Sequence, residues 1–385
     1  MTPSHNKTNL YYLFWVSTII LLLIISSIVL IPTIAQNSAL NNTKLKGMWF
    51  TGMDYRTNPK EQDIAKSLKR LSGLGFNTVF VNVYPGCTVY PVNVIINKVN
   101  NDLFCKHDRT YNKRDILGEF VRNAGNLKVC AWYEYGYMST YANPIYTNNK
   151  STALVNSRGG VEDSKGHFWL NPSHTDVITM QKTIISELAK QYPSINCVQY
   201  DDHFGYNSEM GYNKSITSGY TKSISDYTNP SWIKYRSSLF TRNVVDLFSF
   251  ARKLKPNFEI SISPGDIQSS YTSYLQDTIS WASIKINNKP MIDNFIVQIY
   301  RSDMKTYTPV FARQATKDLI NTKAKVHIAI SGFANGIDLT NNTIESQIKF
   351  ARTQGFQGTA LFYDRYFKFD NTALLKSNRS IILSS

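Results

Sequence analysis

The chain alternates between two patterns of apolar and polar residues. Short apolar runs, rich in β-branched and aromatic residues, predict strands, and between successive runs apolar residues recur at helical spacing. The predicted strands are residues 46–50, 78–83, 128–133, 197–200, 258–263, 294–299, 325–330 and 358–362. The predicted helices lie near residues 62–74, 115–126, 175–191, 232–255, 271–281, 310–320 and 344–353.

This alternation requires parallel pairing, because a helix that crosses back over the sheet joins successive strands. Eight strands in a domain spanning residues 46–370 fit a closed (β/α)8 barrel of the TIM type. A doubly wound open sheet is the alternative, but its Gly-X-Gly-X-X-Gly phosphate turn is missing. The long connections 84–114, 134–173 and 201–230 all follow strands, which is where a barrel carries its catalytic loops.

The N-terminal region predicts a membrane-spanning or signal helix. No charged residue occurs from Asn9 to Thr43, and residues 10–35 are almost continuously apolar. A short segment, 1–9, precedes this helix, and a polar linker, 36–45, follows it. We expect an exported protein, which is either anchored in the membrane by this helix or secreted after cleavage near Ala35. Residues 371–385 form a C-terminal tail.

The charge balance favours an anionic partner. Lys and Arg outnumber Asp and Glu by 42 to 27 in 385 residues, which gives a net charge of +15. No compact Lys/Arg run supports nucleic-acid binding, so an acidic envelope polymer or a phospholipid surface fits better. A merely basic solvated surface is the alternative interpretation.

The four cysteines show no metal-binding spacing, and we expect neither a metal nor a cofactor. Cys87 and Cys105 bracket one predicted loop and could form a disulfide outside the cytoplasm. Cys130 and Cys197 lie within apolar strand patterns, and we expect them to be thiols in the core.

Acidic residues follow several predicted strands. Glu134 follows the third strand, and Asp201 and Asp202 follow the fourth, so all three are candidate catalytic residues at neighbouring strand tips. Glycosidic cleavage commonly needs one protonated carboxyl group and one ionised carboxylate. Neighbouring strands are about 4.8 Å apart, which allows either the retaining or the inverting separation. A helix cap or loop turn is the structural alternative for the Asp pair.

Strand alternation puts Gln199 and Asp201 on one face of the fourth strand and Asp202 on the other. A polar lumen favours Asp201 pointing inward, although a bend at the strand tip could also bring Asp202 in. His203 could suggest metal ligation, but contiguous residues usually point in different directions. We therefore expect His203 to bond a sugar hydroxyl or a carboxylate.

Aromatic and polar residues that follow the same strands could contact a polysaccharide substrate, because aromatic faces stack on sugar rings and amide or guanidinium groups bond their substituents. Asp54, Asp266 and Asp364 follow other strands and are secondary candidates. The predicted substrate-binding residues are Trp49, Asp54, Tyr84, Trp132, Asn171, His203, Tyr206, Asp266, Gln298, Tyr300 and Arg301.

Two motifs carry a family resemblance, namely Trp169-Leu170-Asn171-Pro172-Ser173-His174 and Gln199-Tyr200-Asp201-Asp202-His203-Phe204-Gly205-Tyr206. With shorter segments in the same order over residues 46–366, the chain resembles the glycosyl-hydrolase-like family 10 proteins of bacterial envelopes, particularly those of cyanobacteria. The resemblance implies a (β/α)8 barrel and, for some members, cleavage of peptidoglycan strands whose stem peptides have been removed. Gly265 departs from the family pattern, which usually has Asn after Ser-Pro, and many members are lipoproteins.

Together these patterns predict a glycoside hydrolase that acts on a cell-envelope glycan, most of all on peptidoglycan. In this hypothesis Asp201 or Asp202 is the general acid or orients a substrate acetamido group, and Glu134 is the second carboxyl group. A non-catalytic glycan-binding barrel and a transglycosylase are the alternatives, and fold alone does not separate them.

Overall fold

A computed structural model describes residues 44–91, 111, 114–140, 143–224 and 226–367 of the chain. The described residues from Leu45 onward belong to one compact unit. The predicted N-terminal helix, most of the linker and the C-terminal tail lie outside the described residues. In the described ranges, no helix combines the length and the apolar character needed to cross a membrane.

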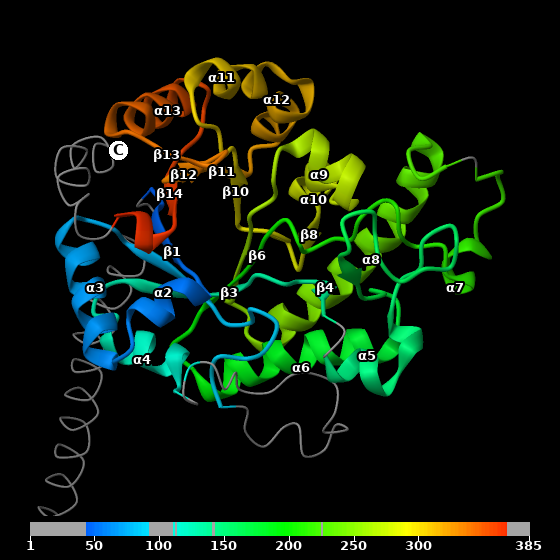
Figure 1. Cartoon of the computed structure of the whole chain (residues 1–385), viewed down its shortest axis with the longest axis horizontal. Coiled ribbons are helices and arrows are strands. Elements are labelled where there is room, and N and C mark those ends of the chain that lie inside the picture. The colour runs from blue at the N-terminus through cyan, green and yellow to red at the C-terminus, as the bar shows by residue number, and fades with distance from the viewer. Residues whose placement is uncertain (1–43, 92–110, 112–113, 141–142, 225, 368–385) are drawn as a thin grey trace, which may run out of the picture. The chain divides into compact units, whose positions relative to one another are not determined.

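Eight parallel strands close into a barrel, as the sequence predicts (Figure 1). Neighbouring strands in the barrel follow the order β1-β14-β11-β10-β7-β6-β3-β2, so each strand pairs with its predecessor and successor. Predicted and observed strand limits differ by at most two residues. The strands are β1 (Lys46–Phe50), β2 (Thr78–Asn82), β3 (Lys128–Tyr133), β6 (Cys197–Tyr200), β7 (Glu259–Ile262), β10 (Asn294–Gln298), β11 (Lys325–Ser331) and β14 (Thr359–Phe362).

Helices surround the barrel and bury one apolar face each (Figure 1). The long helices are α3 (Glu61–Gly73), α4 (Ile116–Asn123), α6 (Thr175–Gln191), α8 (Pro230–Leu254), α9 (Ile267–Tyr274), α11 (Met304–Ala312), α12 (Gln314–Asn321) and α13 (Asn341–Thr353). Shorter elements in the connections are α2 (Gly52–Thr57), β4 (Met138–Ser139), α5 (Pro144–Asn148), η3 (Lys150–Thr152), β5 (Phe168–Trp169), α7 (Lys214–Thr217), α10 (Thr278–Ser283), β8 (Lys285–Ile286), β9 (Lys289–Pro290), β12 (Phe333–Ala334), β13 (Ile337–Asp338) and η4 (Asp364–Phe367).

Two ranges that were each predicted as one helix contain parts of two helices in the structure. The predicted helix 271–281 is two helices, because Leu275 ends α9 in a left-handed conformation (φ 60°) and the Asp277 side chain then caps α10. The predicted helix 310–320 spans the end of α11 and most of α12, which are separated by the extended backbone of Arg313.

The barrel interior is a small core of its own, separate from the layer between strands and helices. Its apolar members are Trp49, Phe80, Cys130, Trp132, Cys197, Ile296, Ala329 and Ala360. They come from alternate positions of their strands, as period-two alternation requires. Gly47 makes room for Phe80, since a Cβ atom on Gly47 would lie 2.6 Å from the Phe80 ring.

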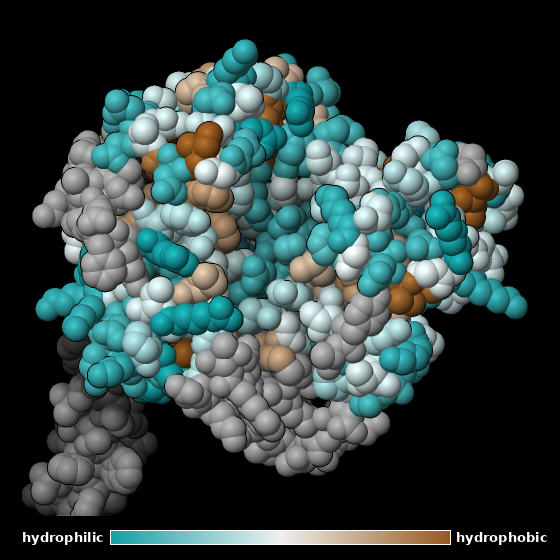
Figure 2. Space-filling model, viewed as in Figure 1, coloured by the Kyte–Doolittle hydropathy of each residue, from teal (hydrophilic) through white to brown (hydrophobic). Residues whose placement is uncertain are grey.

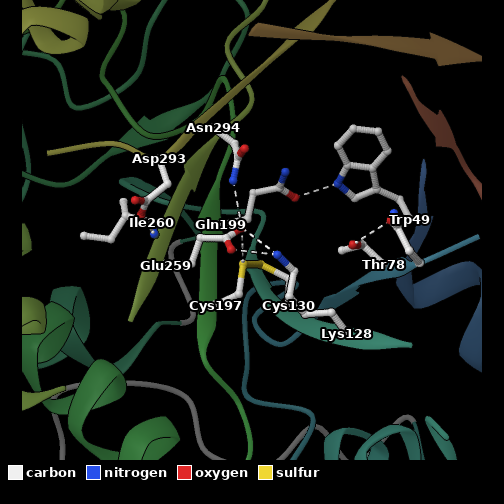
Figure 3. Close-up of a disulfide and its surroundings, with 11 residues drawn as sticks. Trp49, Thr78, Lys128, Cys130, Cys197, Gln199, Glu259, Ile260, Asp293 and Asn294 are labelled. Carbon is white, nitrogen blue, oxygen red and sulfur yellow. Dashed lines mark hydrogen bonds and ion pairs between the residues drawn. A yellow bond between two sulfur atoms is a disulfide. The ribbon is translucent and has the colours of Figure 1, made fainter. Parts of the chain in front are cut away.

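Cys130 and Cys197 form a disulfide inside this interior, so the prediction of two core thiols is wrong (Figure 3). Ala131 pairs with Val198, which places the two cysteines directly opposite each other on β3 and β6, with Cα atoms 4.6 Å apart. The sequence placed both residues in neighbouring strands, but the pairing depends on the register between those strands. Cys87 is also disulfide-bonded, and its predicted partner Cys105 lies outside the described residues.

Polar side chains close the barrel on the amino-terminal side of the disulfide (Figure 3). The Lys128 ammonium contacts both Glu259 carboxylate oxygens at 2.7 Å, and Asn294 donates to the same carboxylate at 2.7 Å. His327 is buried beside Asn294, and burial lowers the pKa of this imidazole to about 3. This end of the barrel is therefore sealed by paired groups, and the acids that follow the strands lie at the opposite end.

Candidate active site

The three predicted catalytic carboxyl groups lie together at the carboxyl ends of β3 and β6. Tyr133 pairs with Tyr200, so Glu134 and Asp201 follow the same level of two adjacent strands. His203 joins them, because its Nδ1 lies 3.1 Å from the Glu134 carbonyl oxygen and 3.4 Å and 3.9 Å from the nearest carboxylate oxygens of Asp201 and Asp202. The topology of the barrel thus gathers residues that are 67 to 69 positions apart in sequence.

Asp201 points inward and is buried. The Trp132 indole N–H donates to its Oδ2 at 3.0 Å, and the backbone N–H of His203 donates to its Oδ1 at 3.0 Å. Burial raises the pKa of the Asp201 carboxyl to about 6, although the positive charge and hydrogen bonds of His203 oppose the rise. Both oxygens face donors, so the site accommodates an ionised carboxylate.

The carboxyl group of Glu134 has a different environment from that of Asp201. Its Oε2 accepts a hydrogen bond from the Asn82 amide, whose own oxygen accepts from the backbone N–H of Tyr84. Burial, followed by the nearby charge of Asp201, raises the pKa of the Glu134 carboxyl to about 7. Glu134 therefore keeps its proton to a higher pH than Asp201 does.

His203 supplies a positive charge to this cluster. Burial alone would lower the pKa of its imidazole, but the carboxylates of Asp202, Asp201 and Glu134 raise it to about 10. Gly136 allows the loops that follow β3 and β6 to meet here, since a Cβ atom on it would lie 2.4 Å from the His203 carbonyl oxygen. The Tyr137 N–H bonds that carbonyl at 3.0 Å, which holds the imidazole against the acids.

Asp202 is half-buried and faces the next strands. The Gln298 amide donates to its Oδ1 at 3.3 Å and to the Ser263 carbonyl at 2.8 Å. Gln298 is the last residue of β10, and Ser263 directly follows β7. The hydrogen-bonded pair of Asp202 and Gln298 therefore extends the polar site across the barrel mouth. Figure 2 shows that the face is hollowed near its middle, with hydrophilic residues visible in the hollow.

Among the described residues, one group of side chains could hold a metal ion, namely Asp201, Asp202 and His203, whose ligand atoms lie within 4.8 Å of one another. The expectation that contiguous residues diverge is therefore wrong here, because the chain turns directly after β6. A metal would compete with the proton that the surrounding carboxylates hold on His203 Nδ1.

Aromatic rings border the carboxyl groups. Trp132 makes an edge contact with Phe362 (ring centroids 6.2 Å apart), and Phe362 stacks on the predicted residue Tyr300 at 5.5 Å. The predicted residue Trp49 lies deeper, buried in the barrel interior, where its indole N–H donates to Gln199 at 2.7 Å (Figure 3). Trp49 therefore supports the floor of the site.

Two predicted acids have structural contacts instead. Asp54 is fully buried in α2 and forms a capping box with Thr51, accepting from its backbone N–H at 2.7 Å. Asp266 caps α9 and pairs with Arg313. The secondary candidate Asp364 is likewise buried, in an ion pair with Arg70. Helix capping, which was the alternative for the Asp201–Asp202 pair, instead describes Asp54 and Asp266.

The other predicted binding residues differ in their distance from the carboxyl cluster. Tyr84 is buried and stacked on Tyr133 at 5.0 Å, and Tyr206 is buried against Phe240. Asn171 is buried at the start of the connection to α6, where its side chain accepts from the Ser173 N–H at 3.0 Å. Arg301 is half-buried beside Tyr300, and its guanidinium donates to the Tyr300 carbonyl at 2.9 Å.

Sequence reasoning missed three residues that shape the site. Asn82 bonds Glu134, Phe362 carries the aromatic border, and the buried Gln276 amide donates to the carbonyls of Asp201 and Phe204 at 2.8 Å. Asn82 had a usable signal, since it is a polar residue that ends an otherwise apolar run. Gln276 had no signal in the strand pattern, because it supports the acids from a connection between two helices; its one signal was the family-like segment Tyr274-Leu275-Gln276-Asp277.

Comparisons with known proteins agree with this architecture. The glycosyl hydrolase-like 10 profile matches residues 44–347. No curated protein sequence matches the chain. Among solved structures, a cold-adapted β-galactosidase from Rahnella sp. R3 is similar with a TM-score of 0.62 and 10% identity, over 89% of this chain and 56% of that one.

Two further structures share the fold. A β-galactosidase from Bacillus circulans has a TM-score of 0.54 and 12% identity, covering 83% of this chain and 50% of that one. A provisionally assigned α-L-fucosidase from Bacteroides thetaiotaomicron has a TM-score of 0.52 and 13% identity, covering 89% and 93%. This chain thus spans about half the length of the two β-galactosidases, and identities this low show a shared fold alone. The profile match covers most of the barrel, and the chain belongs to the glycosyl hydrolase-like 10 family.

Proposed function

We propose that this protein is a glycoside hydrolase that cleaves a β-linked, N-acetylated glycan of the cell envelope, with peptidoglycan strands as the leading substrate. One observation carries the proposal. Two carboxyl groups on adjacent strand tips, the half-buried Glu134 and the buried Asp201, have different hydrogen-bonding partners and different raised pKa values, about 7 and about 6. Glycosidases need such a pair, one protonated and one ionised.

Glu134 is the proposed proton donor to the leaving oxygen, because its higher pKa keeps it protonated near neutral pH. Asp201 is the proposed ionised partner, which attacks the sugar, activates water or stabilises the positive charge that develops on the ring. The N–H donors of Trp132 and His203 favour its charged form. This assignment gives Glu134 the acid role that the sequence left open between the Asp residues.

Asp202 is the proposed orienting group. Its exposure is intermediate, and Gln298 holds one of its oxygens, so the other carboxylate oxygen can accept a hydrogen bond from a substrate. An acetamido group has the matching N–H donor. This complementarity supports an N-acetylated sugar over an unsubstituted one.

Export and membrane anchoring are part of the proposal. The apolar segment 10–35 supports them, and so does the disulfide inside the barrel, because structural disulfides persist in oxidising compartments outside the cytoplasm. The net charge of +15 suits an anionic polymer such as peptidoglycan, whose denuded strands carry carboxylates. These features support an envelope substrate over a cytoplasmic sugar.

Product release tests the proposal. The purified protein is incubated with intact and with peptide-stripped peptidoglycan, and soluble fragments are identified by mass spectrometry. We expect new reducing ends from the stripped strands, and we expect Glu134→Gln and Asp201→Asn to lower the rate by about 10²–10⁴-fold. Asp202→Asn should mainly weaken substrate binding. Asp266→Asn is the matched control, because that carboxylate caps α9 and pairs with Arg313.

The outcomes separate the alternatives. Binding to stripped strands without fragments from any glycan would refute hydrolysis and favour a non-catalytic glycan-binding barrel. Products that carry a transferred sugar in place of a new reducing end would favour a transglycosylase.

A further inference from the structure

Five aromatic rings form an unbroken series across the carboxyl face of the barrel. Tyr300 stacks on Phe362 with ring centroids 5.5 Å apart, and Phe362 contacts Tyr363 at 4.9 Å. Tyr363 contacts Tyr366 at 4.9 Å, and Tyr366 stacks on Phe333 at 5.4 Å with the ring planes almost parallel. The series joins three connections, those that follow β10, β11 and β14.

The inner end of this series touches the proposed catalytic residues. Phe362 makes an edge contact with Trp132, whose indole N–H bonds Asp201. Burial raises the pKa of the Tyr300 hydroxyl well above its usual range, and the charges of Asp202 and Asp201 add to this rise. A long ligand bound at the carboxyl cluster would therefore contact this aromatic series where it extends away from the cluster.

The outer end is exposed to solvent. Phe333 is 38% exposed, although large apolar side chains are usually buried, while Phe362, Tyr363 and Tyr366 have intermediate exposure. Figure 2 shows hydrophobic colour over the region where Figure 1 draws the β12–β13 hairpin. Such an aromatic surface next to a polar cleft is typical of a binding surface.

The hairpin that carries Phe333 is built to be rigid. Asn335 (φ 53°) and Gly336 (φ 79°) form its two-residue turn, with the positive φ angles that a tight hairpin needs. The backbone N–H of Leu339 bonds the Gly332 carbonyl at 2.9 Å. A Cβ atom on Gly332 would lie 2.7 Å from the Tyr366 Cβ atom, so glycine lets the hairpin base lie against that residue. The two rings are thus held in place before any ligand binds.

We propose that these rings, Tyr363, Tyr366 and Phe333, form a distal binding site for the sugar units of a polysaccharide strand whose cleaved bond lies at Glu134 and Asp201. This inference rests on the proposed function and adds that the enzyme recognises an extended strand. The apolar faces of pyranose rings stack on aromatic rings, and Phe333, which is 38% exposed at the outer end of the series, is accessible for such a contact. The exposed polar side chains of Arg365 and Asp338 flank the series and can bond sugar hydroxyl groups.

Affinity as a function of strand length tests this site. Binding is measured in the full-length Glu134→Gln protein, which should not degrade its ligand, with peptide-free peptidoglycan strands of increasing length as the probes. Phe333→Ala and Tyr366→Ala should weaken binding of long strands by about three- to tenfold, and the loss should shrink as the strand shortens to a disaccharide. Phe333→Trp should retain the affinity, because it keeps an aromatic face.

Ile337→Ala is the matched control. Ile337 is 56% exposed on the same hairpin, but it pairs with Ala334 and so lies on the opposite face from Phe333. We expect the Ile337→Ala variant to bind strands of every length with the affinity of the parent protein. Unfolding curves of every variant check that the hairpin substitutions leave the barrel folded.

Two failures can be told apart. If the unsubstituted protein cleaves stripped strands but Phe333→Ala and Tyr366→Ala bind every length as the parent does, the distal site is wrong and the proposed function stands. If the unsubstituted protein neither cleaves nor binds any strand, both proposals are wrong.

Discussion

The indole N–H of Trp132 donates a hydrogen bond to Oδ2 of Asp201 across 3.0 Å, and both side chains are buried. Trp132→Phe would keep most of the ring and remove this donor. A hydrogen bond to a charged group contributes about 1.5–3 kcal/mol, so we expect kcat/KM to fall by about ten- to a hundredfold. Because the donor favours the ionised form, its loss should also raise the pKa of Asp201 and move the acidic limb of the pH profile upward.

Trp49→Phe is the matched control for that substitution. Trp49 is also a buried indole in the barrel interior, but its N–H donates to Gln199 and not to a carboxylate. We expect Trp49→Phe to lower the free energy of unfolding and to leave the acidic limb of the pH profile in place. An acidic limb that stays put in Trp132→Phe, or that moves equally in both variants, would contradict the role of this hydrogen bond.

The pH dependence of kcat/KM should be a narrow bell. Activity requires Asp201 ionised, which gives an acidic limb near pH 6, and Glu134 protonated, which gives a basic limb near pH 7. Initial rates of fragment release between pH 4 and pH 9 check this. Because the two carboxyl groups interact, the limbs report the pair. A rate that keeps rising above pH 8 would exclude Glu134 as the proton donor.

Asn82→Ala should move one limb of that bell. The Asn82 amide stabilises the Glu134 carboxylate and so lowers its pKa, and removing the amide should raise the pKa and shift the basic limb to higher pH. The acidic limb should stay where it is, because the Asn82 amide donates its hydrogen bond to Glu134 and not to Asp201. A basic limb that stays or moves downward would contradict this arrangement.

Strand-level features of this protein could be predicted from its sequence, because they depend on local periodicity. The limits of β1, β3 and β6 match the prediction residue for residue, since each is a short apolar run between polar neighbours. The gathering of Glu134 with Asp201 and Asp202 followed from the rule that strand tips of a barrel share one face. The split between α9 and α10 did not, because the left-handed turn at Leu275 has no glycine to mark it.

Features that depend on register or on distant contacts could not be predicted. The Cys130–Cys197 disulfide requires knowing that the two residues lie level on adjacent strands, and a shift of one residue would point one of them away. Asp54 and Asp266 were secondary, substrate-binding candidates in the sequence, because each follows a strand. Only the structure shows that Thr51 and Arg313 already engage them.

The disulfide should matter for stability. It links β3 to β6, the strands that carry Glu134 and Asp201, across 67 residues of sequence. Replacing both cysteines, Cys130→Ala with Cys197→Ala, should lower the free energy of unfolding by about 2–4 kcal/mol, measured by urea denaturation without reductant. Ile296→Val, in the same interior cluster, controls for lost packing and should cost about 0.5–1.5 kcal/mol. Equal denaturation midpoints for the double variant and the parent would contradict this.

His203→Asn should shift both limbs of the pH profile, whereas Trp132→Phe and Asn82→Ala should each shift one limb. The charged imidazole lowers the pKa of Glu134 and of Asp201, so its removal should raise both values and move the whole bell to higher pH. The backbone N–H that bonds Asp201 is retained, so the change reports the charge of the side chain. Rates across the pH range measure the shift. A bell that does not move would mean that His203 is neutral over the pH range of activity. The difference between the pKa values of Glu134 and Asp201 would then come from their other partners alone.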